Sequence, residues 1–411
     1  LAYLSKHPND SFMHTHMLAV LGEMDSQAAL KLLDTAWGRN PIVRALLLEA
    51  GTVYEHLATI KSRFKDRDHR SLSRQTPLVY LRSEMQADQK RHRQWAQLFH
   101  ANLTRHRPLP PPAATGFSFP VKGVDGSELP LPEQAHLKSI VARYLPDMEN
   151  RGSPRPPLEK TIARAEARLE RLGLFEGPEM RHQSSLSLYA LLRKWHFEHR
   201  VNNGYLDYTF SSVQTSYGRG LSLEAARASC LMEVAERCSS FASIEEAEIG
   251  GTRRPHPIIH GTRSELLKKD HQILDPNSLG LEVPYLDEPL YWMEGERSTD
   301  GGAEPIWVPV QCVYLFCNLD ERSLFSGLGS TGLASGNTLE EARLSALYEL
   351  IERDSQAVNP FHPSRCFRVY AKDEKINALF EDYRSRGIHL QFQDVSPGNG
   401  IPSCTCSVTH R

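Results

Sequence analysis

Two pairs of glutamates with the same spacing are the residues of this sequence best suited to chemistry: Glu233 with Glu236, and Glu349 with Glu352. On a helix, two acids three residues apart lie side by side, and their repulsion costs roughly a few tenths of a kcal/mol. A cation between them removes that cost. A site made of carboxylates alone suits Mg²⁺, which proteins hold with acidic side chains and nucleotide phosphates. The absence of His and Cys from the pairs disfavours zinc. Two facing helices would bring the four carboxylates to one Mg²⁺ site.

The glutamate pairs belong to an internal repeat. Residues 218–237 align with residues 334–353 at an offset of 116, and ten of the twenty positions are identical. The identical positions are Gly220/Gly336, Leu223/Leu339, Glu224/Glu340, Ala226/Ala342, Arg227/Arg343, Ser229/Ser345, Leu231/Leu347, Glu233/Glu349, Glu236/Glu352 and Arg237/Arg353. At 100° per residue, the Ser and both Glu of each copy fall on one narrow stripe of a helix. The Arg that follows could neutralise phosphate oxygens.

Each copy begins with a glycine-containing loop and a residue that can cap a helix, Ser222 in the first and Thr338 in the second. Thr338 with Glu341 also matches a capping box. Residues 334–337 lead into a helix N-terminus, where backbone N–H groups can bind an anion. The sequence contains no Walker-type phosphate loop.

The face of each helix opposite the acids is apolar, with Leu231 and Val234 in the first copy and Leu347 and Leu350 in the second. We expect both faces to be buried. A duplicated structural helix pair with plain salt bridges would explain one copy, but the same Ser-Glu-Glu-Arg stripe in two copies favours a site.

The rest of the chain divides at proline-rich breaks. We expect a helical region over residues 1–107, linkers flanking one helix (133–145) over residues 108–157, and an α+β domain over residues 158–411. In the helical region, one helix should run from an N-cap at Ser26 to Gly38, and the next should begin at Asn40, as in paired or tetratricopeptide-like helices. In the α+β domain, the sequence predicts a helix from Leu158 that ends at Gly173, and strands at 208–210 and 307–316.

Composition limits the function classes. With 48 Lys and Arg against 50 Asp and Glu, the chain lacks the basic character of a protein built to bind nucleic acid. It has no apolar run long enough to span a membrane. Seven scattered cysteines indicate reduced thiols of a cytoplasmic protein. Residues 61–107 carry twelve basic and four acidic residues, which favours solvated helix faces over a docking face for an acidic peptide or RNA.

Both repeat segments resemble the signature of the YcaO family. The matching motifs are Ser229-x-x-x-Glu233-x-x-Glu236-Arg237, Ser335-Gly336-Asn337-Thr338-x-Glu340-Glu341-Ala342 and Glu349-x-x-Glu352-Arg353, with Trp292-x-x-Gly295 and Trp307-Val308-Pro309 between them. The resemblance covers about residues 158–411. It implies a YcaO-like fold and an ATP site built from glutamate-rich helices around Mg²⁺.

By this resemblance, the four glutamates would hold Mg²⁺. The residues that would line the nucleotide site are Arg219, Ser229, Arg237, Asn337, Glu341 and Arg353. Arg219 stands where the family often has Lys. The family usually continues beyond Arg411 to a third helix bearing Glu and Gln, so we expect the domain to lack its C-terminal part.

The resemblance implies an enzyme that uses ATP to phosphorylate a peptide backbone amide, which then becomes a thioamide or an azoline ring. Its partners would be a peptide or protein substrate and possible partner proteins that donate sulfur or bind a leader peptide, and we expect a homodimer. The alternative is an accessory protein that supports methylthiolation of a ribosomal protein or recruits a modification enzyme.

Overall fold

The computed structural model describes residues 2–84, 89–117, 155–183, 186–245, 248–250, 256–299, 302–317, 319–327, 329–369 and 372–410. The chain forms two compact units. Unit 1 comprises Leu1–Gln89, Phe197–Ser212 and Cys238–Ser330, and unit 2 comprises Lys90–His196, Val213–Arg237 and Thr331–Arg411. The two units do not coincide with the predicted ranges, which change at residues 107 and 157. Each unit contains parts of both the N-terminal and the C-terminal region. The predicted helix at 133–145 lies outside the described residues.

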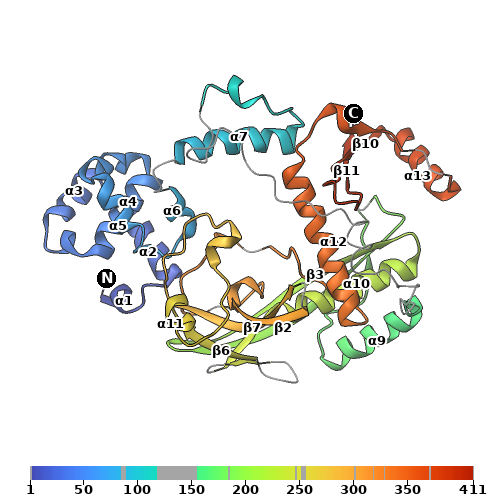
Figure 1. Cartoon of the computed structure of the whole chain (residues 1–411), viewed down its shortest axis with the longest axis horizontal. Coiled ribbons are helices and arrows are strands. Elements are labelled where there is room, and N and C mark those ends of the chain that lie inside the picture. Colours follow the sequence, from blue (N-terminus) through green and yellow to red (C-terminus); the bar gives the residue numbers. More distant parts are fainter. Residues whose placement is uncertain are drawn as a thin grey trace. The chain divides into compact units, whose positions relative to one another are not determined.

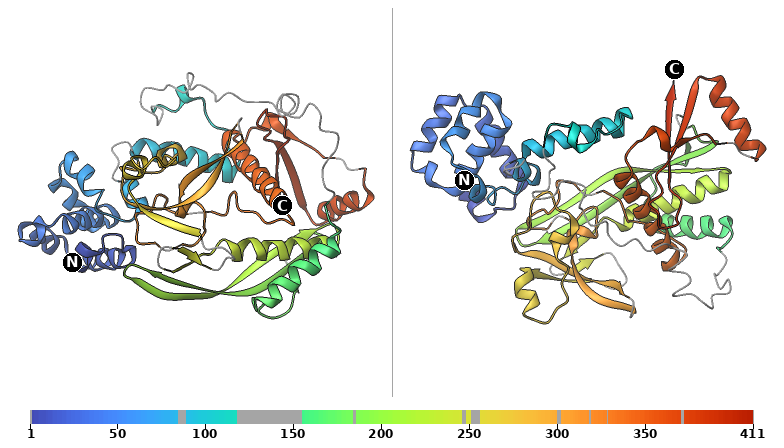
Figure 2. Two further views of the ribbon diagram at one scale, coloured as in Figure 1. Left: turned by 60° about the horizontal axis from the view of Figure 1, so that its bottom comes forward. Right: turned by 45° about the horizontal axis from the view of Figure 1, so that its top comes forward.

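The N-terminal part of unit 1 is all helical, as predicted, and is blue in Figures 1 and 2. Its helices are α1 (Ala2–Lys6), α2 (Ser11–Gly22), α3 (Ser26–Asp34), η1 (Trp37–Arg39), α4 (Pro41–Val53), η2 (Glu55–Arg63), α5 (Asp66–Leu72) and α6 (Val79–Glu84). The predicted helix starts are correct to one residue. Asp25, not Ser26, caps α3 by accepting from two backbone N–H groups, and Asn40 caps α4 with Pro41 in its first turn.

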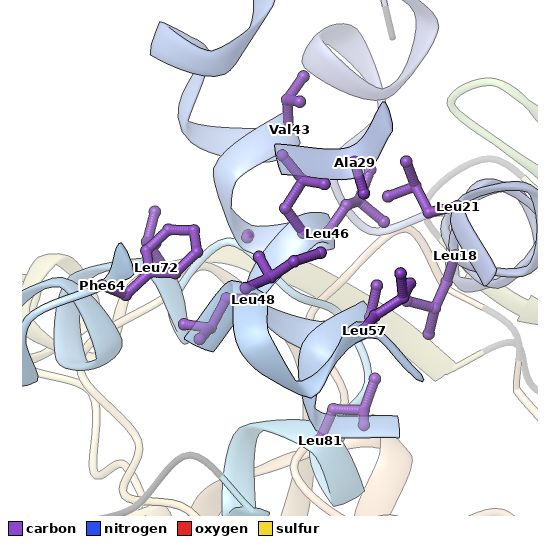
Figure 3. Close-up of a cluster of buried hydrophobic side chains, with 14 of the residues drawn as sticks. Leu18, Leu21, Ala29, Val43, Leu46, Leu48, Leu57, Phe64, Leu72 and Leu81 are labelled. Carbon is purple, nitrogen blue, oxygen red and sulfur yellow. The ribbon is translucent and has the colours of Figure 1, made fainter. Parts of the chain in front are cut away.

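The core of this helical part is formed largely by α4. Leu46, Leu47 and Leu48 have no exposed surface, and side chains of the neighbouring helices, among them Leu18 and Leu57, pack around them (Figure 3). Burying an aliphatic side chain of this size contributes roughly 1.5–3 kcal/mol. The helices are therefore held by a shared core rather than by their intrinsic propensity.

The second part of unit 1 is a sheet. Its strands are β4 (Ser243–Glu245), β5 (Glu248–Gly250), β6 (His256–Gly261), β7 (Leu290–Thr299) and β8 (Gly302–Pro309), which pair antiparallel in this order. The end of β2 (Tyr189–Asn203) adds to it in parallel, with Val201 opposite Ile244. The connections hold α11 (Arg263–Leu267), η4 (Pro276–Leu279) and η5 (Val310–Cys312). The predicted strand at 307–316 is too long, because β8 ends at Pro309 and a 3₁₀ turn follows.

Unit 2 contains α7 (Gln89–Arg105), η3 (Pro112–Ala114), α9 (Leu158–Arg171), β1 (Met180–Arg181), α10 (Leu223–Ser239), α12 (Leu339–Val358), η6 (Pro363–Arg365), β9 (Cys366–Phe367), α13 (Glu374–Ser385), β10 (Ile388–Asp394) and β11 (Cys404–His410). Helix α9 begins at Leu158 and is followed by Gly173 in the left-handed conformation (φ 66°), as predicted. Strand β2 pairs with β1 and with β3 (Leu206–Gly220), which includes the predicted strand at 208–210.

Helix α10 lies along the part of the β2–β3 hairpin that belongs to unit 2 (Figure 2). Its Ala226 and Cys230 pack with Leu191 of β2. Gly218 of β3 makes this approach possible, because a Cβ atom there would meet the Ala226 carbonyl oxygen at 2.1 Å. The glycine therefore sets how closely the helix lies on the strand.

A second, three-stranded sheet has the order β11–β10–β9, and all its pairs are antiparallel. In Figure 1 it lies next to the C-terminal end of α12. All seven cysteines of the chain are free thiols. In the described ranges no helix is both long and apolar enough to cross a membrane.

Candidate functional site

Helix α10 carries the first glutamate pair and begins as the sequence predicts. The Ser222 hydroxyl accepts from the Ala225 N–H (3.1 Å), so it caps the first turn. The apolar side of the helix is buried, with Leu231 3% and Val234 0% exposed. Burial of that side fixes the helix rotation, and the acidic stripe lies on the less buried side.

Helix α12 carries the second pair and begins at Thr338, whose hydroxyl accepts from the Glu341 N–H (3.3 Å). The predicted capping box is only half present, because the Glu341 carboxylate accepts from the backbone and side-chain N–H groups of Asn337 (2.8 and 3.0 Å) and not from Thr338. These two bonds, the backbone one first, lower the pKa of Glu341. The loop before α12 is thereby fixed to its first turn.

The same loop is held from two other elements of unit 2. The Ser335 hydroxyl donates to the Met232 carbonyl of α10 (2.6 Å), and the Thr161 hydroxyl of α9 donates to the Asn337 side-chain oxygen (3.2 Å). Gly336 is required here, since a Cβ atom would lie 2.5 Å from the Ala342 nitrogen. Asn337 therefore lies in a loop that is bonded to α9, to α10 and to Glu341 in the first turn of α12.

The prediction that the apolar face of α12 is buried is wrong. Leu347 is 54% and Leu350 is 45% exposed, and Ser355 is the buried residue of this helix. The corresponding face of α10 packs on the β2–β3 hairpin, whereas this face of α12 is only partly covered, with Gly332 next to Leu350. The repeat is thus alike in sequence but not in packing.

The arginines of the repeat pair with its glutamates. Arg237 lies between Glu233 (Nε to Oε1, 3.8 Å) and Glu236 (Nη1 to Oε1, 3.5 Å), and Arg353 Nη2 lies 3.6 Å from Glu349 Oε1. These distances are those of loose ion pairs that can be exchanged for ligands. Glu233 is also oriented by the backbone, since its second oxygen accepts from the N–H of Tyr217 (3.1 Å).

Electrostatics couple the two copies. Burial raises the pKa of Glu236 to about 7, Arg237 opposes this shift, and the carboxylates of Glu349 and Glu233 add to it. The charge on Glu349 of α12 thus acts on Glu236 of α10. That the four glutamates meet at one Mg²⁺ site stays a prediction.

The remaining predicted site residues lie at the surface. Glu352, Ser229 and Arg219 are exposed. We infer no metal or nucleotide contact for them from geometry, and their roles stay predictions.

Mg²⁺ fits the donors present. The coupled groups are all carboxylates, the hard oxygen ligands that Mg²⁺ prefers, and one or two of them suffice when nucleotide phosphates supply further ligands. Over the described part of the chain, no group of three or more His, Cys, Asp or Glu side chains forms a ready-made metal site. The protein thus offers a Glu236–Glu349 pair rather than a complete cage.

One ion pair of the repeat was not predicted as part of the site. Arg227 donates to both oxygens of Glu179, from Nε (2.9 Å) and Nη2 (2.9 Å). This bidentate pair attaches α10 to the segment before β1. The identity of Arg227 with Arg343 in the repeat was a signal for its importance, but nothing in the sequence indicated Glu179.

Comparison with known proteins shows which family the C-terminal half of the chain is similar to. A family model described as YcaO cyclodehydratase, ATP- and Mg²⁺-binding, matches residues 217–411. Residues 217–411, a little under half of the chain, are therefore similar to a YcaO domain. The cofactors of the family are accordingly ATP and Mg²⁺, in agreement with the cofactors expected from the sequence.

Two curated relatives are similar to part of this chain. An uncharacterized protein of Methanothermobacter thermautotrophicus (strain Delta H) is 32% identical over 198 residues, 46% of this chain and 46% of the relative. An uncharacterized protein in the tfuA 3′ region of Rhizobium leguminosarum bv. trifolii is 28% identical over 193 residues, 45% and 43% of the two chains. The chain thus spans less than half the length of these relatives.

Two solved structures match part of the chain at low similarity. A heterocyclase in complex with substrate and cofactor matches with a TM-score of 0.45 and 18% identity, over 64% of this chain and 37% of the other. YcaO from Methanopyrus kandleri, bound with AMPPCP and Mg²⁺, matches with a TM-score of 0.37 and 19% identity, over 58% and 54%.

Proposed function

We propose that this protein uses ATP and Mg²⁺ to activate a peptide backbone amide by phosphorylation, leading to a thioamide or an azoline. The observation that carries the proposal is the 2.6 Å hydrogen bond from Ser335 to the Met232 carbonyl, which joins the two copies of the repeat, and the Glu349 charge acts on Glu236 in agreement with it. Two partly buried carboxylates that repel each other favour a bound cation. The matched family binds this cation together with ATP.

The chain's own residues have distinct roles in this proposal. Glu233, Glu236, Glu349 and Glu352 would hold Mg²⁺, whose charge offsets that of the phosphates. Arg237 and Arg353 hold the glutamates in the free protein and would turn toward phosphate oxygens. Asn337 and Glu341, which are bonded to each other, would position the nucleotide.

Phosphorylation turns the amide oxygen, a poor leaving group, into a good one. The amide oxygen takes the γ-phosphoryl group of ATP and ADP is released. A nucleophile then adds to the amide carbon, and the oxygen leaves as phosphate. Sulfide as the nucleophile leaves a thioamide, whereas a neighbouring Cys, Ser or Thr side chain closes an azoline ring with loss of the amide proton. The protein contributes mainly positioning and electrostatic stabilisation.

Calorimetry of Mg·ATP binding tests the site. Glu236→Gln and Glu349→Gln each remove one charge without changing size, and we expect each to weaken binding about tenfold or more, which corresponds to about 1.4 kcal/mol. Glu381→Gln on α13, an exposed acid paired with Arg384, is the matched control and should bind as the wild type does. Unchanged affinity in both site variants would refute the Mg²⁺ site.

Mass spectrometry tests the reaction. Incubation with Mg·ATP, sulfide and candidate peptides should release phosphate and replace one peptide oxygen by sulfur, or remove one water when a ring forms. A partner protein that donates sulfur or binds a leader peptide would be added in a second series. Nucleotide binding without phosphate release in either series would favour the accessory role over the enzyme.

A further inference from the structure

The three-stranded sheet of unit 2 has one polar face. In most sheets, a face that is covered by helices is apolar. Gln391 lies opposite Ser407 and Gln393 opposite Thr405 on β10 and β11, so these four side chains share one face. A sheet face packed beneath other elements usually carries Val, Ile or Leu. Polar groups on a covered face lower stability unless they form hydrogen bonds within the protein or with a ligand.

This face forms the floor of a cavity of about 200 Å³. Its walls come from the ends of α7 and α12 and from β9, and five carboxamides and one thiol carry its chemistry: Asn102, Gln356, Asn359, Gln391, Gln393 and Cys366. Lys, Arg, Asp and Glu are absent from the residues that line it.

The cavity is held open by contacts between α7 and the segment after α12. The Asn102 side chain, 3% exposed, accepts from the Phe361 N–H (2.8 Å) and donates to the Phe361 carbonyl (3.0 Å). The His106 ring stacks on the Phe361 ring, with centroids 4.7 Å apart, and its Nε2 lies 3.1 Å from the Ser407 hydroxyl. These contacts leave little freedom for the walls to collapse, so the cavity is preformed.

Several lining groups keep unused hydrogen-bonding capacity. Gln391 donates to the Cys366 sulfur (3.2 Å), and Gln393, which is 5% exposed, donates to the Pro360 carbonyl (3.2 Å). Within the described ranges, the side-chain oxygens of both and the whole carboxamide of Gln356 have no protein partner. A carboxamide presents one acceptor beside its donors, which is the pattern of a peptide bond.

The chemistry of the cavity selects a neutral ligand. A phosphate or carboxylate would find no Lys or Arg among the lining residues, and the Arg365 guanidinium beside the wall is already bonded to the Asn359 side chain, so an anion there would be poorly compensated. The volume is below the roughly 300–1,000 Å³ of pockets that enclose drug-sized ligands. It therefore fits a short stretch of main chain better than a nucleotide.

We infer that this cavity binds the uncharged backbone of the peptide substrate, at a place separate from the nucleotide site. This inference rests on the proposed function. Gln356 follows Glu349 by seven residues on α12, which is about 10 Å along the helix. An extended peptide covers that distance with about three residues. The peptide bound in the cavity would thus lie a few residues from the amide that is activated.

Alkylation of Cys366 by N-ethylmaleimide, followed site by site with mass spectrometry, tests the inference on the full chain. The probe is a capped hexapeptide of Gly, Ser and Ala at millimolar concentration. We expect the peptide to slow alkylation of Cys366 by about threefold or more, because alkylation slows by this much when the peptide occupies most of the cavities. Cys404, which does not line the cavity, should react at an unchanged rate.

Variants localise the effect. Gln356→Glu places a charge in the cavity at constant size and should abolish protection by the neutral peptide, whereas Gln97→Glu on the exposed side of α7 should not. Mg·ATP binding by Gln356→Glu should equal that of the wild type, which also shows that the variant is folded.

Each other outcome has a definite meaning. Absent protection with intact Mg·ATP binding would overturn the inference and leave the proposed function standing. Equal protection in Gln356→Glu and wild type, or stronger protection by adenosine than by the peptide, would also overturn it. Protection of Cys366 in a protein that binds no Mg·ATP would instead support the cavity and contradict the proposed function.

Discussion

The Ser335 hydroxyl donates a 2.6 Å hydrogen bond to the backbone carbonyl of Met232, the residue directly before Glu233. This bond joins the loop of the second repeat copy to the helix of the first. It places Asn337, which the family resemblance assigns to the nucleotide, at a fixed position relative to the first glutamate pair. The loop of the second copy is therefore attached to the helix of the first copy by a hydrogen bond to its backbone.

Removing this bond should weaken nucleotide binding. In Ser335→Ala the loop loses one partly buried hydrogen bond, worth about 0.5–1.5 kcal/mol. We expect Mg·ATP affinity measured by calorimetry to fall by roughly two- to tenfold. Ser385→Ala on α13 removes a similar hydroxyl-to-carbonyl bond at an exposed position and should bind normally. Equal affinities of wild type and Ser335→Ala would show that the loop position is irrelevant.

Gly218 should tolerate no side chain. A Cβ atom there would lie 2.1 Å from the Ala226 carbonyl oxygen and 2.3 Å from the Cys230 nitrogen, so α10 would have to move away from β3. We expect Gly218→Ala to lower the free energy of unfolding in urea by about 1–3 kcal/mol. It should also weaken Mg·ATP binding, because α10 carries two of the glutamates. Gly327→Ala, with no atom within 4 Å of its Cβ position, is the control and should have little effect.

Local signals explain why much of the site was predictable. Caps, glycines and apolar spacing sufficed for α10 and α12, because each acts within a few residues along the chain. The duplicated stripe also predicted that the four glutamates come together, and this part of the site stays a prediction.

Packing over long sequence separations could not be predicted. The exposed Leu347 of α12 follows from which elements cover a helix, and the sequence of the helix does not contain that information. The bonds of Asn102 to Phe361 and of Arg227 to Glu179 join residues 259 and 48 positions apart. A single sequence without related sequences holds no signal for such pairs.

Glu349→Gln should separate the effects of charge repulsion and ligand binding. Without Mg²⁺ the variant loses a like charge near Glu236, so its melting temperature should equal or slightly exceed that of the wild type. With Mg·ATP the wild type gains stability in proportion to RT ln(1 + [L]/Kd), and the variant should gain clearly less. Differential scanning fluorimetry with and without EDTA measures both. A parallel rise in both proteins would mean that Glu349 is not a ligand.

Glu321 should make the stability of unit 1 fall as the pH rises. Its carboxylate accepts from the Tyr291 N–H (2.6 Å) and the Gln311 side-chain N–H (2.9 Å), but burial outweighs these bonds and raises its pKa to about 8, from 4.5. Because the folded state holds this proton more tightly than the unfolded state, the contribution is fully present below pH 4.5. It is lost as the pH rises through 8.

Relative to Glu321→Gln, which cannot titrate, the wild type should lose up to about 1.4 kcal/mol per pH unit over this range. Urea unfolding at several pH values measures the difference in slope, and exposed Glu381→Gln should keep the slope of the wild type. Parallel slopes for wild type and Glu321→Gln would mean that the buried carboxyl is ionised throughout, held by its two hydrogen bonds.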